Sequence, residues 1–218
     1  MKYRVHVLKP GYSEFDGDSL RADGTITLLK GRHNIMVDCG SPWDEDIILT
    51  ELEKHKILPN GINFMVCTHG HTDHAGNLNL FQQAVHINGD SICKEDCYTT
   101  LPFLLGKRFF LDDEHIEIIK TPGHTSNDIS VIVRDVKDFG TIVIAGDLFE
   151  KEGDIENPTL WMMASENVDT QRVNRVKVLK IADYIVPGHG QMFKVTEEMR
   201  NTEESYLNWD RPDEGELT

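Results

Sequence analysis

The 218-residue sequence has little of several features that mark particular classes of protein. It has four cysteines, none in a Cys-x-x-Cys pair, and only 22 lysines and arginines against 37 aspartates and glutamates. The formal net charge of −15 argues against a broad basic surface that binds nucleic acid or anionic membranes non-specifically. It still permits a narrow substrate channel whose centre is made positive by bound divalent metals.

Long hydrophobic runs are also missing. The N-terminal sequence MKYRVHVLKP lacks the apolar core and cleavage-like site of a signal peptide, and runs such as TIVIA are too short to span a bilayer. We therefore expect a protein of the cytoplasm, with the nucleus as a second compartment, that is not secreted and has no membrane partner. The four cysteines are then expected to be reduced thiols, with a zinc or redox site at Cys93 and Cys97 as the alternative.

Strand and helix patterns are mixed along the chain, which indicates the α/β class. Residues 3–9 and 25–38 are predicted to form strands, the second range with a turn at residues 30–32. A helix is expected to follow, with Ser41 as its N-cap and Pro42 in its first position.

The chain contains no repeat, low-complexity tract or linker that would divide it. We therefore expect residues 1–195 to form one domain. Because the sequence turns acidic from about Thr196, residues 196–218 are expected to form an acidic C-terminal helix and tail, not a separate domain, with frayed last residues.

Four short apolar segments, INFMVC, HIEIIK, GTIVIA and DYIV, are predicted to be strands. Each is followed by a turn that carries histidine or aspartate, namely THGHTDH, TPGHT, GD and PGHG. Irregular loops at the ends of buried strands are where proteins build binding and catalytic sites. The four turns are therefore candidates for one site.

The segment THGHTDHAGN, at residues 68–77, is the densest of these turns. Imidazoles this close would repel one another if protonated, so a bound metal is the expected reason for the cluster. On an extended segment, residues two apart point the same way, so His69 and His71 can bind one ion together. Asp73 and His74 follow a turn and can face a second ion. Zinc prefers such imidazole and carboxylate ligands.

Two further histidines lie in glycine turns, and Asp147 ends an apolar strand with a carboxylate whose two oxygens can bridge two metals. The predicted ligands are His69, His71 and His124 for one ion, Asp73, His74 and His189 for the other, and Asp147 shared by both. We expect two zinc ions per chain with a bridging hydroxide; iron and manganese are the alternative metals. Paired metals stabilise the attacking and departing oxygens of a hydrolysis and lower the pKa of water to about 7.

Asp38, in VDCG, lies at the end of another predicted strand. It can orient a ligand histidine through a hydrogen bond, or it can cap its own loop. The remaining histidines are predicted to be structural, and they are His6, His33, His55, His86 and His115.

These motifs, in this order, resemble those of the metallo-β-lactamase superfamily over nearly the whole chain. The resemblance implies an αββα four-layer sandwich, in which two mixed β-sheets pack face to face with helices outside. It also implies a dinuclear zinc centre at one edge with the ligand roles given above. Asp73 would in addition be a catalytic residue, because it would accept a proton from the nucleophilic water.

The position of Asp147 favours thioester or phosphodiester hydrolysis over lactam hydrolysis within this superfamily, because true β-lactamases typically carry a different residue there. Few residues follow His189, so the glutathione-binding helical extension of glyoxalase II-type members is expected to be largely missing. No long segment separates the motifs, so the large insertion of cleavage-factor-type nucleases is also expected to be absent.

The segments GYSE, RADGTITLL, VDCGSPW and LWMMASEN are similar to those of one animal group within the superfamily, reported as dimeric zinc endoribonucleases acting at the 3′ end of histone pre-mRNA. This resemblance implies an RNA substrate that enters a narrow site and a homodimer, for which the apolar residues 101–110 are a candidate surface. Two alternatives remain open. One is a glyoxalase II-like hydrolase of hydroxyacylglutathione or another acyl thioester, and the other is a persulfide dioxygenase with one iron.

Overall fold

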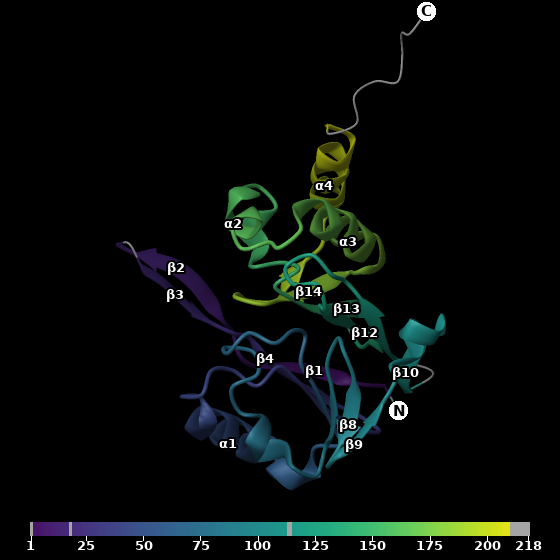
Figure 1. Cartoon of the computed structure of the whole chain (residues 1–218). Coiled ribbons are helices and arrows are strands. Elements are labelled where there is room, and N and C mark those ends of the chain that lie inside the picture. The colour runs from purple at the N-terminus through teal and green to yellow at the C-terminus, as the bar shows by residue number, and fades with distance from the viewer. Residues whose placement is uncertain (1, 18, 113–114, 210–218) are drawn as a thin grey trace, which may run out of the picture.

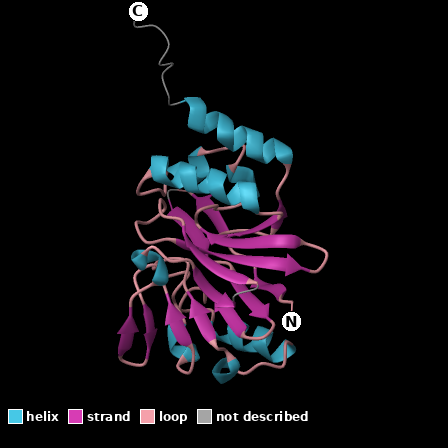
Figure 2. Ribbon diagram, turned by 90° about the vertical axis from the view of Figure 1, so that its right-hand side faces the viewer, coloured by secondary structure: helices cyan, strands magenta, loops and turns pink. Residues whose placement is uncertain are grey.

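Two β-sheets pack face to face in the structure, a computed structural model that describes residues 2–17, 19–112 and 115–209. Helices cover the outer sides of the sheets, as the view turned by 90° shows most clearly (Figure 2). The predicted αββα sandwich is therefore confirmed.

The first sheet is mixed. In pairing order it contains β1 (Arg4–Lys9), β4 (Ile26–Lys30), β5 (Asn34–Val37), β6 (Phe64–Val66), β7 (Val85–Ile87), β8 (Ile92–Lys94) and β9 (Cys97–Thr99). The neighbours β5, β6 and β7 are parallel and the other pairs are antiparallel. The strands predicted in residues 3–9 and 25–38 are thus confirmed as β1, β4 and β5.

The second sheet is antiparallel except for one pair. It contains β10 (Phe109–Asp112), β11 (Ile116–Lys120), β12 (Ile129–Val136), β13 (Gly140–Gly146), β14 (Tyr184–Pro187) and β15 (Phe193–Lys194), with β13 and β14 parallel. A separate hairpin of β2 (Tyr12–Asp16) and β3 (Ser19–Asp23), which the sequence patterns did not predict, projects from the sandwich (Figure 1).

The α-helices lie on opposite sides of the sandwich (Figure 1). They are α1 (Glu45–Lys54) on the first sheet, and α2 (Thr159–Met162), α3 (Val168–Ile181) and α4 (Glu197–Trp209) on the side of the second sheet. Short 3₁₀ helices span Pro59–Gly61, Leu78–Phe81, Pro102–Leu105 and Glu152–Asp154. Among the described residues, no helix combines the length and apolar content needed to cross a membrane.

The first helix begins later than predicted. Its first residue is Glu45 and its N-cap is Asp44, so the assignments of Ser41 as N-cap and of Pro42 as the first helical residue were wrong. The physical reason is a turn before the helix, in which the Asp44 carboxylate accepts hydrogen bonds from the Ser41 backbone N–H (2.8 Å) and hydroxyl (3.1 Å). At the other end, α4 lies within the acidic segment predicted for residues 196–218, and residues 210–218 of the predicted tail lie outside the described residues.

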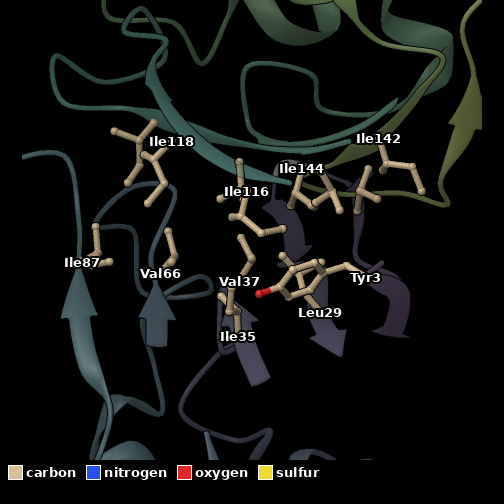
Figure 3. Close-up of a cluster of buried hydrophobic side chains, with 14 of the residues drawn as sticks. Tyr3, Leu29, Ile35, Val37, Val66, Ile87, Ile116, Ile118, Ile142 and Ile144 are labelled. Atoms are coloured by element: carbon tan, nitrogen blue, oxygen red, sulfur yellow. The ribbon is translucent and has the colours of Figure 1, made fainter. Parts of the chain in front are cut away.

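The main core lies between the sheets (Figure 3). Leu29 and Val37 of the first sheet face Ile116 and Ile144 of the second, and all four side chains are buried. Alternate residues of each strand therefore point into the shared interior, while the opposite faces pack on the helices. This packing fixes the edge at which the functional loops meet.

The apolar residues 101–110 are divided between core and surface. Leu101 and Phe109 are buried, whereas Leu104 and Leu105 are exposed. Arg108 is held by a salt bridge of 2.7 Å to Glu117. The two exposed leucines are compatible with a homodimer surface at this segment, which stays a prediction.

A buried arginine ties α3 to α4, to α2 and to the segment that follows β13. Arg175 of α3 is fully buried and donates hydrogen bonds to Asp154 (2.7 Å) and to Glu203 of α4 (2.9 Å). Its guanidinium also lies 4.2 Å from the ring centre of Phe149 and 4.8 Å from that of Trp161. Burial of a charge is costly without partners, and here two carboxylates and two rings supply them.

We expect Arg175→Leu to lower the free energy of unfolding by about 3–5 kcal/mol, because it leaves two buried carboxylates without their cation. Urea unfolding of the metal-free protein measures this loss. The matched control is Lys180→Ala, which removes an exposed ion pair between the same two helices, with Glu204. That change should cost about 1 kcal/mol or less, and equal losses in the two variants would contradict the assigned role of Arg175.

Candidate metal centre

The four predicted turns meet at one edge of the sandwich. His69 follows β6 of the first sheet, whereas His124, Asp147 and His189 follow β11, β13 and β14 of the second. Backbone hydrogen bonds join the two sheets at this edge, from Ile129 N to Thr68 O (2.9 Å) and from Thr25 N to Gly188 O (2.7 Å). The loops are therefore held against each other by the backbone as well as by their side chains.

The first group of side chains brings three imidazoles to one point. His71 Nδ1 lies 3.0 Å from His69 Nε2 and 3.0 Å from His124 Nε2. One carboxylate oxygen, Asp147 Oδ2, lies 3.5 Å from His69 Nε2 and 3.3 Å from His124 Nε2. The ring nitrogens converge beside a shared oxygen, which is the arrangement that a tetrahedral metal site requires.

The second group lies beside the same carboxylate and shares its Oδ2 with the first group. Asp147 Oδ1 is 3.1 Å from His74 Nε2, and Asp147 Oδ2 is 3.2 Å from His189 Nε2. Asp73 Oδ2 completes the group at 3.8 Å from each of these two nitrogens. The structure thus brings all seven predicted ligand residues together, in the two groups predicted, with ligand atoms within 4.8 Å of one another in each group.

These distances fit metal ions. Zinc–nitrogen bonds of about 2.0–2.1 Å in a tetrahedron place neighbouring ligand atoms about 3.3 Å apart. His74 Nε2 and Asp147 Oδ1 are buried 3.1 Å apart, yet they lack the geometry of a hydrogen bond to each other or to any other described residue. Buried polar atoms are nearly always satisfied, so atoms left in this way indicate a ligand. The donor set of imidazoles and carboxylates suits zinc, iron or manganese.

The second ring nitrogens orient three of the histidines. His74 Nδ1 donates to the Asp38 carboxylate (2.9 Å), and His189 Nδ1 donates to the backbone carbonyl of Asp23 (3.1 Å). Because these oxygens only accept, each Nδ1 carries the proton and each Nε2 turns its lone pair to the centre. His69 Nδ1 is likewise 3.1 Å from the Thr68 hydroxyl.

Asp38 takes the first of the two roles considered for it, and it binds the histidine-rich loop rather than capping its own loop. Besides contacting His74, its carboxylate accepts hydrogen bonds from the Thr68 backbone N–H (2.7 Å) and hydroxyl (2.8 Å). Its φ of 58° places it in the left-handed region, which aspartate tolerates better than most residues. It therefore joins the ends of β5 and β6 and orients a histidine at the same time.

The electrostatics of the centre are set by Asp147. Burial disfavours its charge, but His74, His189 and His69 around it hold the pKa of this carboxyl well below its usual range. Burial likewise opposes a charge on His189, yet Asp147 raises the pKa of His189 to about 9. The pKa of His74 is also well above its usual range, because Asp147 and Asp38 outweigh burial, whereas burial lowers that of His69.

Glu150 is a residue of the centre that the sequence reasoning missed. It is buried, its Oε2 lies 3.8 Å from His189 Nε2, and it forms a third group of potential ligands with Asp147 and His189. Burial, and then the Asp147 carboxylate, raise the pKa of Glu150 to about 8. The sequence signal for Glu150 was its position three residues after Asp147. The segment LFE at residues 148–150, however, matches no recognisable motif of metal ligands.

The other candidate sites differ in outcome. Cys93 and Cys97 are free thiols, and neither joins a group of potential metal ligands among the described residues. In the glycine turn that carries His189, a Cβ on Gly188 would collide with the Asp147 carboxylate, so glycine at this position lets the loop approach that side chain.

Comparisons with known proteins agree with the motifs. The sequence profile of the metallo-beta-lactamase superfamily matches residues 21–189. The chain is 41% identical over 195 residues to metallo-beta-lactamase domain-containing protein 1 of Xenopus laevis, covering 88% of this chain and 82% of the relative. Its identity to the protein of the same name from Homo sapiens is 35% over 232 residues, covering 92% and 85%.

Solved structures also share the fold. The structure of BJP-1, a subclass B3 metallo-β-lactamase of Bradyrhizobium japonicum, is similar with a TM-score of 0.58 at 17% sequence identity, covering 87% of this chain and 86% of that one. Together with the profile and the relatives, this confirms the resemblance inferred from the motifs.

The raised pKa values of His74 and His189 predict that metal binding at the second group releases protons. Without metal, His189 with its pKa of about 9 is protonated at neutral pH, and the pKa of His74 is also raised. Zinc affinity at the second group should therefore rise as the pH approaches about 9, by about tenfold per pH unit for each proton displaced. His69 and His124 have lowered pKa values and are already unprotonated, so affinity at the first group should change less. Chelator competition across pH measures both, and identical pH dependence at the two groups would contradict the assignment.

Proposed function

The chain belongs to the metallo-β-lactamase superfamily as a metallohydrolase with a His/Asp metal site, and we propose that it is a dinuclear zinc endoribonuclease. The observation that carries the proposal is the Asp147 carboxylate, whose oxygens face two separate groups of imidazoles. The choice of RNA, with the 3′ end of histone pre-mRNA as the proposed target, rests on similarity to the animal relatives. The proposed substrate bond is the phosphodiester.

Two zinc ions held by these groups would supply an acidified water and positive charge for the departing oxygen. Asp73 is the residue placed to take up the proton of the attacking water. Its side chain is partly exposed, and its Oδ2 lies 3.8 Å from both His74 Nε2 and His189 Nε2, at the open side of the second group. The buried residues Asp147 and Asp38 instead hold the imidazoles in place.

A narrow entry is consistent with the charge of the molecule. The net charge of −15 leaves little basic surface, and Arg108 is engaged with Glu117. A phosphodiester would therefore be attracted by the metal-loaded centre itself rather than by a surrounding patch. Broad affinity for RNA is not part of the proposal.

We expect a 2′-deoxy substitution at the scissile nucleotide to leave RNA cleavage intact, because water and not the 2′-hydroxyl is the nucleophile. The products should carry a 5′-phosphate and a 3′-hydroxyl, as end-labelled RNA resolved on gels would show. Asp73→Asn should lower kcat by at least about a hundredfold, the usual effect of losing a proton acceptor. Loss of cleavage on deoxy substitution together with a cyclic phosphate product would refute the mechanism.

One observation favours a second function, the hydrolysis of acyl thioesters. A cavity of about 400 Å³ adjoins the centre at Glu150, between the β2–β3 hairpin and the chain around α2. Phe15, Leu20 and Met163 give it apolar walls, and its charged lining residues are Glu14, Glu150 and Lys151, whose Nζ donates to the Ser13 carbonyl (2.8 Å). Such a lining suits an apolar acyl group better than a phosphate.

The cavity separates the two functions. If the substrate is an acyl thioester, Leu20→Asp should raise its KM by about tenfold, the effect of losing roughly one apolar contact of 1.5 kcal/mol, with kcat nearly unchanged. The control is Leu58→Asp, another exposed leucine that lines a different pocket. A panel of glutathione thioesters, structured RNA and single-stranded DNA supplies the rates. Wild-type cleavage of RNA without thioester turnover would eliminate the second function.

Metal analysis of the purified wild-type protein tests the persulfide dioxygenase alternative. The seven residues fall into two groups, so the proposal requires about two metal ions per chain. Metal analysis that finds one iron and no zinc would instead support a mononuclear persulfide dioxygenase.

A further inference from the structure

Helix α3 lies against the loops that carry Asp147 and His124, and we propose that Gln171 on this helix is a positioning residue for the metal centre. The inference rests on the proposed dinuclear site, since it concerns how the chain holds the shared carboxylate. Gln171 touches no ligand atom, and it acts through the backbone of two ligand loops.

The first contact is with the Asp147 loop. Gln171 is fully buried, and its Nε2 donates to the Asp147 backbone carbonyl at 2.9 Å and lies 3.4 Å from that of Leu148. One helical turn later, Arg175 donates to the Leu148 carbonyl at 2.9 Å. Two consecutive carbonyls beside the shared carboxylate are therefore fixed by one face of α3.

The second contact is with the His124 loop. A Cβ on Gly123 would collide with the backbone and Cβ of Gln171, so this loop packs directly on the helix at that residue. Asn167 N–H donates to the Gly123 carbonyl (2.9 Å), and Asn174 Nδ2 donates to the Pro122 carbonyl (2.7 Å). The helix face that holds Asp147 thus also holds the loop of His124.

The amide group of Gln171 indicates that this side chain positions the Asp147 loop and does not merely fill space. A hydrocarbon side chain of similar size would occupy the same volume but would leave the Asp147 carbonyl without this donor. Among the described residues its Oε1 has no hydrogen-bond partner, so an amide acceptor is buried there at a cost. The amide donor is what offsets that cost. Because Asp147 lies between both groups, its displacement should weaken both sites together.

The experiment uses zinc as the probe and the full chain as it exists. Gln171→Leu and Gln171→Met are compared with wild type by chelator competition for each zinc ion, and by urea unfolding without metal. We expect both zinc affinities to fall about 10–100-fold, as for other residues that support metal ligands. The methionine variant keeps a flexible chain of similar length, so it tests the idea if the leucine variant folds poorly.

Two controls isolate the effect. Val178 lies on the same helix and is buried in the apolar cluster between α3 and the second sheet. Val178→Ala should therefore lower the urea midpoint without changing the affinity for either zinc ion. Asp38→Ala removes the partner of His74 and should weaken the ion of the second group more than that of the first. Gln171 variants should differ from both by weakening the two ions equally.

Two results would overturn the inference in distinguishable ways. If wild type binds two zinc ions and both Gln171 variants lose stability but keep wild-type affinities, Gln171 is structural and the proposed function stands. If wild type binds fewer than two divalent ions under saturating zinc, the dinuclear site fails and this inference fails with it.

Discussion

The buried Asp147 carboxylate is the interaction on which the rest of the site depends. A lone carboxylate in this interior would be strongly disfavoured. Four imidazoles surround it within 3.1–3.5 Å, and they come from loops far apart in the chain. Its Oδ2 lies near His69 and His124 of the first group and near His189 of the second, and its Oδ1 lies near His74, so one carboxylate contacts both groups. The proposed chemistry of paired metals follows from that shared contact.

The residues that hold the ligand side chains around this carboxylate come from the first sheet, from the β2–β3 hairpin and from α3. Asp38 and the Asp23 carbonyl fix the rings of His74 and His189, while α3 fixes the backbone at Asp147 and at Gly123. The histidines are thus held by groups that only accept hydrogen bonds, and the loops by groups that donate them. This complementarity leaves the ring nitrogens at the centre free to bind a cation.

Local patterns predicted the α/β class and the turns that carry the seven clustered residues, whereas the sandwich was implied by the resemblance of these motifs to a known superfamily. Apolar strands ending in His or Asp place those side chains at a sheet edge, and spacing alone paired His69 with His71. The supports were harder to predict, because a backbone carbonyl such as that of Asp23 has no residue-type signature. Glu150 lies in no recognisable motif. The prediction of Ser41 as N-cap was wrong because a turn closed by side-chain contacts of Asp44 precedes the helix. The β2–β3 hairpin was missed, since its strands are largely exposed and lack a buried alternating pattern.

The seam between the sheets has a consequence for how the molecule comes into being. His69, His71, Asp73 and His74 belong to the half of the chain that forms the first sheet, whereas His124, Asp147 and His189 belong to the half that forms the second. A growing polypeptide carries the early histidines long before their counterparts are made. The first group needs residues up to Asp147 and the second needs residues up to His189, and each requires both halves of the chain to dock. The metal centre can therefore form only late in synthesis, and a complete centre requires that the two halves of the chain have docked.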